Sequence, residues 1–384
     1  MQAILPPVRR PVPLGSRWAS ESLDTFFVGH GVRVVGSGTQ ALALAIKDSA
    51  VRSHSSRPEV ILPAYGCPNL IAASVYAGVR PRLVDTAKGQ WGYDLDQLAA
   101  ALSKDAVAIV AVNLLGVGDQ ADRLREIATA SAIPLIQDSA QHLPQDLPVS
   151  WRGEYIVFSF GRGKPLNLLR GGVLLYPAPR QSNIASITAR SLSGSTEWLL
   201  SRRFAGLAFN VATHPWVYGL AGRLPAAGVG DTHYTPLAVI CRASTGMITQ
   251  VESGLAGYRA APGYDAGVWR EACSAWSAQG VQLLSCASQA VADPLRLRLA
   301  LLAPDAVQRE ALVTALNGRG LGASRMYGAS LERIVGVPHD IACQGPFPNA
   351  ADLAGRLFTL PTHSCVSSAA VGRARQIVCD VLAR

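Results

Sequence analysis

Strand and helix patterns alternate over the first 160 residues of this chain, and that alternation restricts the fold more than any other feature. Short runs rich in Val, Ile and Leu have the character of buried strands, and the segments between them have the apolar spacing of helices. The expected strands are 32–35, 60–63, 81–85, 106–113, 134–138 and 155–160, and the expected helices are 39–49, 70–77, 94–102 and 119–131. This rhythm predicts an α/β fold with a large domain whose mainly parallel mixed sheet is flanked by helices.

The length of 384 residues and the hydrophobic content of 49% predict two domains rather than one. Residues 196–240 are apolar but interrupted by Gly and Pro, and helical patterns and short strands follow them. We therefore expect a Pro-rich N-terminal arm over 1–20, a large domain over 21–240 and a smaller C-terminal α+β domain over 241–384.

Charge and cysteine content limit the functional classes. The net charge is +9, but the arginines are scattered without basic runs or interleaved aromatics, so nucleic acid is not expected as a partner. The seven cysteines form no CxxC pair and no His/Cys ligand spacing, so no metal is expected. An odd number of cysteines without an apolar signal segment indicates reduced thiols in a cytoplasmic protein.

Lys164 is the last lysine of a chain in which arginine supplies almost all of the 35 basic residues. A guanidinium stays protonated and cannot act as an amine nucleophile, so a single lysine here suggests that a primary amine is required. Gly161-Arg162-Gly163 turns the chain after the strand 155–160 and places Lys164 at a strand end, where ligands bind in open α/β sheets. Taken alone, Lys164 is interpreted equally well as an ordinary surface lysine.

Gly36-Ser37-Gly38-Thr39 follows a strand and opens a helix, which imitates a dinucleotide-binding motif. The acidic residue that should end the second strand is missing, so the motif predicts only a phosphate site, with backbone N–H groups and the Thr39 hydroxyl as donors. A plain capped helix start explains it equally well. Lys164 is not part of a P-loop, because no Ser or Thr follows it.

Asp138 and Gln141 follow the strand 134–138. A carboxylate there can stay ionised beside a cationic ring nitrogen, and Gln141 can reach the same ring. The commoner role of such an Asp is to cap the next turn. With the hydroxyl of Ser159, the chain offers phosphate donors, a carboxylate and an amine at successive strand ends. One cofactor, pyridoxal 5'-phosphate (PLP), would explain the set.

These residues resemble the motifs of the DegT/DnrJ/StrS group of PLP-dependent sugar aminotransferases, which have fold type I. The segment 38–42 is similar to the family's G-T-x-A-L phosphate loop, and Asp138 with Gln141 is similar to its D-x-A-Q. Ser159 and Lys164 fit its S-F-x-x-x-K, and the segments 320–327 and 348–363 resemble its small-domain pattern.

The resemblance implies a role for each site residue. Lys164 would hold the cofactor covalently as a Schiff base and act as general base and acid, and Asp138 would keep the ring nitrogen protonated. Gln141 would fix the tilt of the ring. The phosphate would be held by Gly38, Thr39 and Ser159.

The chain also departs from the family pattern. Arg170 stands where the family usually has the Glu of G-E-G-G, and Cys67 stands where an aromatic usually stacks on the cofactor ring. We expect either Tyr65 or the sulfur of Cys67 to pack against the ring. The Asn that normally reaches the partner subunit's phosphate has no clear match over 234–242.

The implied activity is amino transfer from an amino acid donor, glutamate by resemblance, to a keto acceptor such as a nucleotide-linked or otherwise activated keto sugar. Two alternatives stay open. One is a PLP-binding regulator or scaffold without turnover; the other is a PLP-dependent sugar dehydratase-like enzyme, which Lys164 disfavours because that branch has His at this position. Fold type and apolar content also imply a homodimer with shared active sites.

Residues 204–222 carry no formal charge. Asn210, His214, Pro215 and three glycines make insertion across a membrane costly. Burial at a subunit interface or over the active site is one interpretation. Weak peripheral contact with an anionic membrane is the other, because residues 170–223 contain six arginines and a single acid, Glu197.

Overall fold

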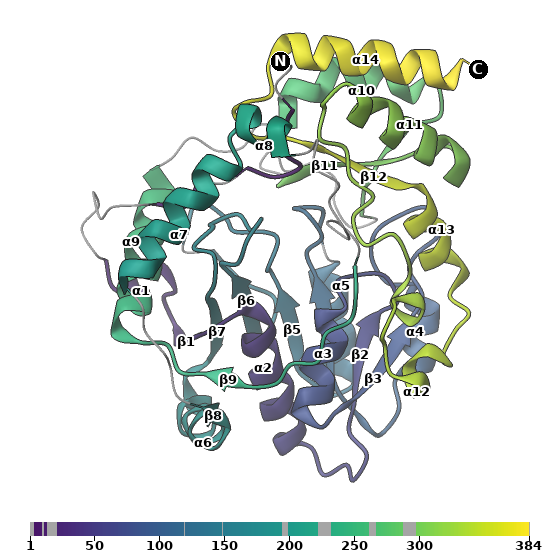
Figure 1. Cartoon of the computed structure of the whole chain (residues 1–384). Helices are drawn as coiled ribbons and strands as arrows, with labels where there is room; N and C mark the ends of the chain where they lie inside the picture. The colour runs from purple at the N-terminus through teal and green to yellow at the C-terminus, as the bar shows by residue number, and fades with distance from the viewer. Residues whose placement is uncertain are drawn as a thin grey trace.

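The computed structural model describes residues 4–9, 11–13, 21–118, 120–147, 149–193, 199–221, 232–260, 266–286 and 297–383. At its centre lies a seven-stranded sheet with the strand order β1-β7-β6-β5-β4-β2-β3 (Figure 1). Its strands are β1 (His30–Val35), β2 (Glu59–Pro63), β3 (Arg80–Val84), β4 (Ala106–Val112), β5 (Leu135–Asp138), β6 (Tyr155–Ser159) and β7 (Gly172–Pro177). Every strand expected over the first 160 residues is present.

Within this sheet, β7 runs antiparallel to β1 and β6, and strands β2 to β6 pair in parallel. A parallel sheet is covered on both faces, so its strands need apolar side chains along their whole length. Strand β4 meets this requirement, with every residue buried up to Ala111. The carboxyl ends of β4, β5 and β6 lie at the same edge of the sheet.

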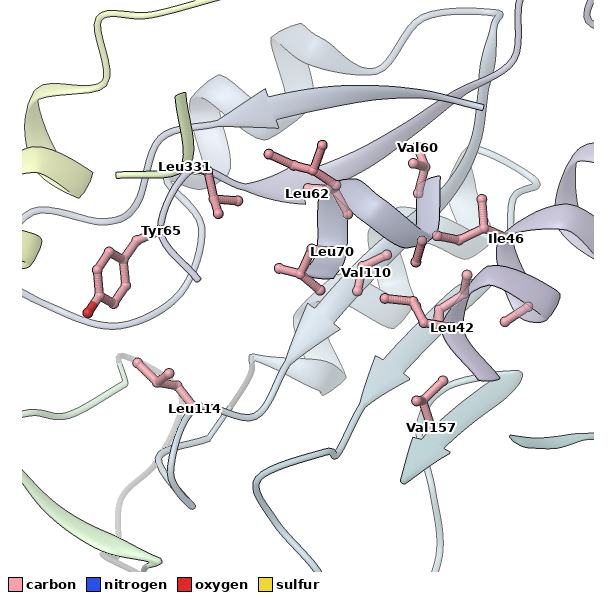
Figure 2. Close-up of a cluster of buried hydrophobic side chains, with 14 of the residues drawn as sticks. Leu42, Ile46, Val60, Leu62, Tyr65, Leu70, Val110, Leu114, Val157 and Leu331 are labelled. Carbon is pink, nitrogen blue, oxygen red and sulfur yellow. The ribbon is translucent and has the colours of Figure 1, made fainter. Parts of the chain in front are cut away.

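The two faces of the sheet are covered by different helices because successive side chains of a strand point to opposite sides. Helices α2 (Gly38–Arg52) and α3 (Asn69–Ala77) cover one face. There the buried cluster includes Leu42, Ile46, Val60, Leu62, Leu70 and Val110 (Figure 2). Helices α4 (Leu95–Ala101) and α5 (Ala121–Ala130) cover the other, where the cluster includes Ile61, Leu98, Ile109 and Leu124.

Helix α9 (Thr245–Ala260) extends the cover of this second face, together with the short helix α1 (Leu23–Phe26). Val251 and Leu255 of α9 belong to one buried cluster with Ile156 and Phe158 of β6. The neighbouring Val157 points to the opposite side and joins the cluster of α2. Strand β6, which precedes Lys164, is therefore held from both faces.

A second, antiparallel sheet contains β10 (Gln282–Leu283), β11 (Arg298–Leu302) and β12 (Leu357–Pro361). It packs against α10 (Arg270–Ser277), α11 (Ala306–Gly318) and α14 (Ser368–Leu382), and the N-terminal arm adds Leu5 to that cluster. A mainly parallel mixed sheet with a smaller α+β unit confirms the expected fold class. The division of the chain near residue 240 stays a prediction.

The remaining helices and short strands complete the described part of the chain. None of the helices in the described ranges is long and apolar enough to cross a membrane. The elements are α6 (Gln181–Ser191), β8 (Leu192–Ser193), α7 (Leu199–Ala212), α8 (Pro215–Ala221), β9 (Ile240–Cys241), α12 (His339–Ala342), α13 (Pro348–Arg356), and the 3-10 helices η1 (Ala178–Arg180), η2 (Ala266–Trp269) and η3 (Leu331–Arg333).

Candidate active site

A cavity with about 560 Å³ of empty volume opens at the carboxyl ends of β4, β5 and β6, beside the start of α2. The residues that line it come from both halves of the chain, and they include most of the residues singled out in the sequence. They are Gly38, Thr39, Leu42, Cys67, Asn69, Leu70, Val112, Asn113, Leu114, Asp138, Ala140, Gln141, Ser159, Lys164 and Tyr327.

Lys164 reaches this cavity because a tight turn ends β6 just before it. The N–H of Lys164 donates to the carbonyl of Gly161 at 3.3 Å, which closes the turn. Gly163 has φ +70°, a conformation that turns of this kind require and that glycine adopts without strain. The placement at a strand end predicted from the sequence is therefore present, and Lys164 lines the cavity rather than an open surface.

Asp138 is the last residue of β5 and lies in the same cavity. One carboxylate oxygen accepts the N–H of Ala140 at 3.0 Å, so Asp138 caps the following turn as well. Burial raises the pKa of Asp138, and the N–H of Ala140 and the nearby ammonium of Lys164 oppose that rise. A cation that reached Asp138 would further favour its ionised form.

The start of α2 forms one end of the cavity. Ser37 is the N-cap, and its hydroxyl accepts the N–H of Gln40 at 3.3 Å. The preceding N–H groups, those of Gly38 and Thr39, belong to the set that a helix leaves without intrahelical partners. A side chain at position 38 would bring its Cβ within 2.6 Å of the Cβ of Ser159, so only glycine keeps this space open.

Gln141 connects the cavity wall to the second half of the chain. Its amide oxygen accepts the N–H of Leu115 at 3.0 Å, and its amide nitrogen donates to the Tyr327 hydroxyl at 2.6 Å. Tyr327 therefore completes the cavity from a segment 186 residues away. Tyr327 is not among the site residues predicted from the sequence, where the segment 320–327 only resembles the family's small-domain pattern.

Of the two side chains expected beside the cofactor ring, Cys67 lines the cavity. Burial raises the pKa of the Cys67 thiol, and the proximity of Lys164 partly offsets this effect. Tyr65 is fully buried, and its ring packs against Trp91 and Tyr327, with ring centroids 6.3 and 5.7 Å apart. Figure 2 shows the Tyr65 ring pointing away from Leu62 and Leu70. Tyr65 thus packs against Tyr327, and it is not among the described residues that line the cavity.

The donor set of the cavity fits PLP. Backbone N–H groups at a helix N-terminus and a hydroxyl suit a phosphate, a buried carboxylate suits a protonated ring nitrogen, and a primary amine suits an aldehyde. The glycine at position 38 leaves room for the phosphate, since a Cβ there would fill the space next to Ser159.

Comparisons with known proteins agree with this arrangement. Residues 21–201, which include Lys164 and Asp138, match the model of the DegT/DnrJ/EryC1/StrS aminotransferase family. The 3-amino-5-hydroxybenzoate synthase of Amycolatopsis mediterranei (strain S699) is 28% identical over 162 residues, which is 40% of this chain. The same match covers 40% of that synthase, so the similarity spans about two fifths of the relative's length.

Solved structures share the fold over nearly the whole chain. A DegT DnrJ EryC1 StrS aminotransferase from Brucella abortus has a TM-score of 0.65 at 17% identity, and the match covers 94% of this chain and 88% of that one. Helicobacter pylori PseC, an aminotransferase involved in the biosynthesis of pseudoaminic acid, has a TM-score of 0.65 at 16% identity, with coverages of 94% and 89%. These matches confirm fold type I. Residues 21–201, which carry the phosphate loop, the carboxylate and the lysine, match the model of the DegT/DnrJ/EryC1/StrS aminotransferase family, and the structural neighbours include aminotransferases of that family.

Proposed function

We propose that this protein is a PLP-dependent aminotransferase that moves an amino group from an amino acid, glutamate in this proposal, to a keto acceptor. The observation that supports it most strongly is that the Lys164 amine, the Asp138 carboxylate and the start of α2 line one cavity. A surface lysine, a turn cap and a plain helix start each account for one of these features, but none of them accounts for the three together. One ligand with an aldehyde, a basic ring nitrogen and a phosphate accounts for all three.

In this proposal each residue acts on a different part of the ligand. Gly38, Thr39 and Ser159 hold the phosphate, and Asp138 accepts a charge-assisted hydrogen bond from the protonated ring nitrogen. PLP, when bound, supplies an electron sink for the carbon that loses a proton. Lys164 would hold the cofactor, and its amine would act on the α-carbon proton of the donor as general base and then as general acid.

The walls of the cavity would orient the substrate and exclude water. Gln141 is fixed at both ends of its amide by Leu115 and Tyr327, so it presents a rigid surface to the ligand. Cys67 would pack its sulfur against the ring in place of the usual aromatic. A buried thiol with a raised pKa stays neutral and suits an apolar contact better than catalysis.

For the acceptor, we propose a keto sugar in an activated or nucleotide-linked form. The support is the family and the fold shared with an aminotransferase that takes part in the biosynthesis of pseudoaminic acid. The Amycolatopsis relative is a 3-amino-5-hydroxybenzoate synthase, so a cyclic keto acid is the natural second member of an acceptor panel. We further propose that the enzyme works as a homodimer.

The test is transfer of a labelled nitrogen. Protein supplemented with PLP is incubated with ¹⁵N-glutamate and a panel of nucleotide-linked keto sugars and cyclic keto acids, and products are analysed by mass spectrometry. We expect label in one acceptor, none with Lys164→Ala, and full transfer with Lys104→Ala, a matched change of an exposed lysine. If the protein binds PLP but transfers the label neither to an acceptor nor to the cofactor, the proposal is contradicted. That result would favour a non-catalytic role.

A further inference from the structure

Tyr327 lines the cavity from the second half of the chain, and its neighbours determine where its hydroxyl proton points. The N–H of Leu115 can only donate, so the oxygen of the Gln141 amide faces Leu115 and the nitrogen faces Tyr327. The Tyr327 hydroxyl oxygen therefore accepts from Gln141 at 2.6 Å, and its own proton must point elsewhere. One group that this proton can reach is the sulfur of Cys67, which is a weak acceptor.

The Tyr327 hydroxyl keeps its proton and stays a donor. Burial raises the pKa of Tyr327 well above its usual value of 10, and the nearby Cys67, Tyr65 and Asp138 raise it further, while the bond from Gln141 opposes the rise. Hydrogen bonds to a charged partner are roughly twice as strong as those between neutral groups. A neutral phenol that faces a cavity and has only a weak acceptor is therefore well suited to bind an anionic oxygen.

The backbone is strained at both ends of this amide bridge. Met326, the residue before Tyr327, has φ +55°, and Leu115 at the other end has φ +58°. Side chains other than glycine disfavour this left-handed conformation. Two bonds between the backbones of Ser324 and Thr359, at 3.1 and 2.8 Å, hold the segment that carries Tyr327 against β12. Strain of this kind persists where the surroundings enforce it, and it is concentrated at functional sites.

The charged side chains of the cavity leave one group of an amino acid donor without a partner. Among the described residues that line the cavity, only Asp138 and Lys164 are charged, and the proposed function uses both for the cofactor. The donor has a carboxylate on the carbon whose proton Lys164 takes, so neutral donors close to Lys164 must bind it. Cys67 lies near both Lys164 and Tyr327, since each lowers the pKa of its thiol. Tyr327 therefore borders the part of the cavity where this carboxylate lies.

We propose that Tyr327 is a substrate-binding residue whose hydroxyl donates a hydrogen bond to the α-carboxylate of the amino acid donor. This assignment rests on the proposed function and adds to it a group that selects the substrate. Gln141 orients the hydroxyl, and the Tyr65 ring packs against the Tyr327 ring with centroids 5.7 Å apart. An amine without an α-carboxylate would gain nothing from Tyr327.

Binding of an unreactive donor analogue tests the proposal. The analogue 2-methylglutamate has the amine and the carboxylates of glutamate but no α-proton, and 4-aminopentanoate is the same molecule without the α-carboxylate. Each is titrated by calorimetry into PLP-loaded protein. We expect Tyr327→Phe to weaken binding of 2-methylglutamate by about ten- to hundredfold, as for a hydrogen bond to a charged group, and to change binding of 4-aminopentanoate by less than about twofold.

Tyr93→Phe is the matched control, because it removes a buried hydroxyl that donates to the carbonyl of Val110 at 2.7 Å and is not part of the cavity lining. It should leave both affinities unchanged, and Tyr327→Phe should keep its affinity for PLP, measured by absorbance. The proposal is overturned if Tyr327→Phe binds 2-methylglutamate as the unchanged protein does, if both analogues lose affinity equally, or if the affinity for PLP is lost.

Failure of the unchanged PLP-loaded protein to bind 2-methylglutamate would overturn it as well. The readout is independent of the proposed function, because neither titration requires amino transfer. A protein that binds 2-methylglutamate through Tyr327 but transfers no labelled nitrogen would contradict the proposed function alone.

Discussion

At the scale of single residues, Asp138 carries two roles that one substitution can separate. Asparagine keeps an oxygen for the N–H of Ala140 but loses the charge that would face the ring nitrogen. We expect Asp138→Asn to bind PLP and to slow amino transfer by about two orders of magnitude or more, because the ring nitrogen is no longer held protonated. Single-turnover rates with a saturating donor measure the effect. A rate near that of the unchanged protein would leave Asp138 as a turn cap only.

His363 is not among the residues that line the cavity described above. It is buried under the N-terminal arm, where Nε2 lies 3.0 Å from the carbonyl of Pro6 and Nδ1 accepts the N–H of Cys365 at 3.3 Å. Burial lowers the pKa of His363 to about 4, from an ordinary value of 6.5. The neutral ring is therefore part of the folded state.

This pKa predicts a pH-dependent stability. Between about pH 4 and pH 6.5 the unfolded chain binds a proton that the folded chain excludes, so the free energy of unfolding rises with pH in that window. Above about pH 6.5 His363 is neutral in the folded and the unfolded chain, and the free energy of unfolding has its full value with respect to this group. As the pH falls toward 4, the free energy of unfolding decreases by roughly 3 kcal/mol. Urea unfolding of the unchanged chain and of His363→Leu at several pH values in this window checks it. The same slope in both proteins would contradict this assignment.

Much of the candidate site could be predicted from the sequence at this scale, and the reason is geometric. Asp138, Ser159 and Lys164 each follow or end a strand of a parallel sheet, so a local pattern sufficed to bring them together. Tyr327 has no such local signal, because its place depends on how the second half of the chain packs on Gln141. Which of Tyr65 and Cys67 lines the cavity also could not be predicted from the sequence. It depends on the packing of Tyr65 against Trp91 and Tyr327.

At the scale of elements, Asp85 links the end of β3 to helix α13. It is buried at the end of β3, and its carboxylate accepts the N–H groups of Asn349 and Ala350 in the first turn of α13, at 3.0 and 2.8 Å. The N-cap residue of α13, Phe347, has no side chain that could accept these bonds. Asp85, which is 264 and 265 positions from Asn349 and Ala350, therefore caps the helix.

We expect Asp85→Ala to lower the free energy of unfolding by about 3 kcal/mol, because it leaves buried N–H groups without an acceptor. Asp94→Ala is the matched control. Asp94 is the local N-cap of α4, where it accepts the N–H groups of Asp96 and Gln97 at an exposed position. That loss should be about 1 kcal/mol. Chemical denaturation of both variants measures the difference. Equal losses would show that the link between β3 and α13 adds nothing to the cap.

The elements of the first half agree with the sequence prediction because each strand is a short apolar run with clear breaks. The structure of the segment 196–240 is harder to predict from the sequence. Gly and Pro interrupt its apolar pattern, so the pattern does not show which side of each helix is covered. Within it, α7 ends before His214 and Pro215 begins α8, as the helix-breaking residues suggest. Phe204 and Leu207 are exposed, and no local pattern reveals the bonds between Asn210 and Val12 that join α7 to the N-terminal arm.

At the scale of the whole molecule, we predict a homodimer with active sites that take residues from both subunits. Light scattering should give about twice the chain mass of 40.4 kDa. Full activity in a protein that stays monomeric at high dilution would contradict the shared sites.

The central claim is that Lys164 holds PLP in this cavity and exchanges it for an amino donor. The most direct measurement is borohydride reduction of the PLP-loaded protein followed by peptide mass mapping, with and without prior addition of glutamate. We predict that the cofactor mass is found on the peptide containing Lys164, that glutamate added before reduction removes most of it, and that Lys164→Ala carries none. Covalent cofactor on another lysine, or on the Lys164→Ala protein, would contradict the account.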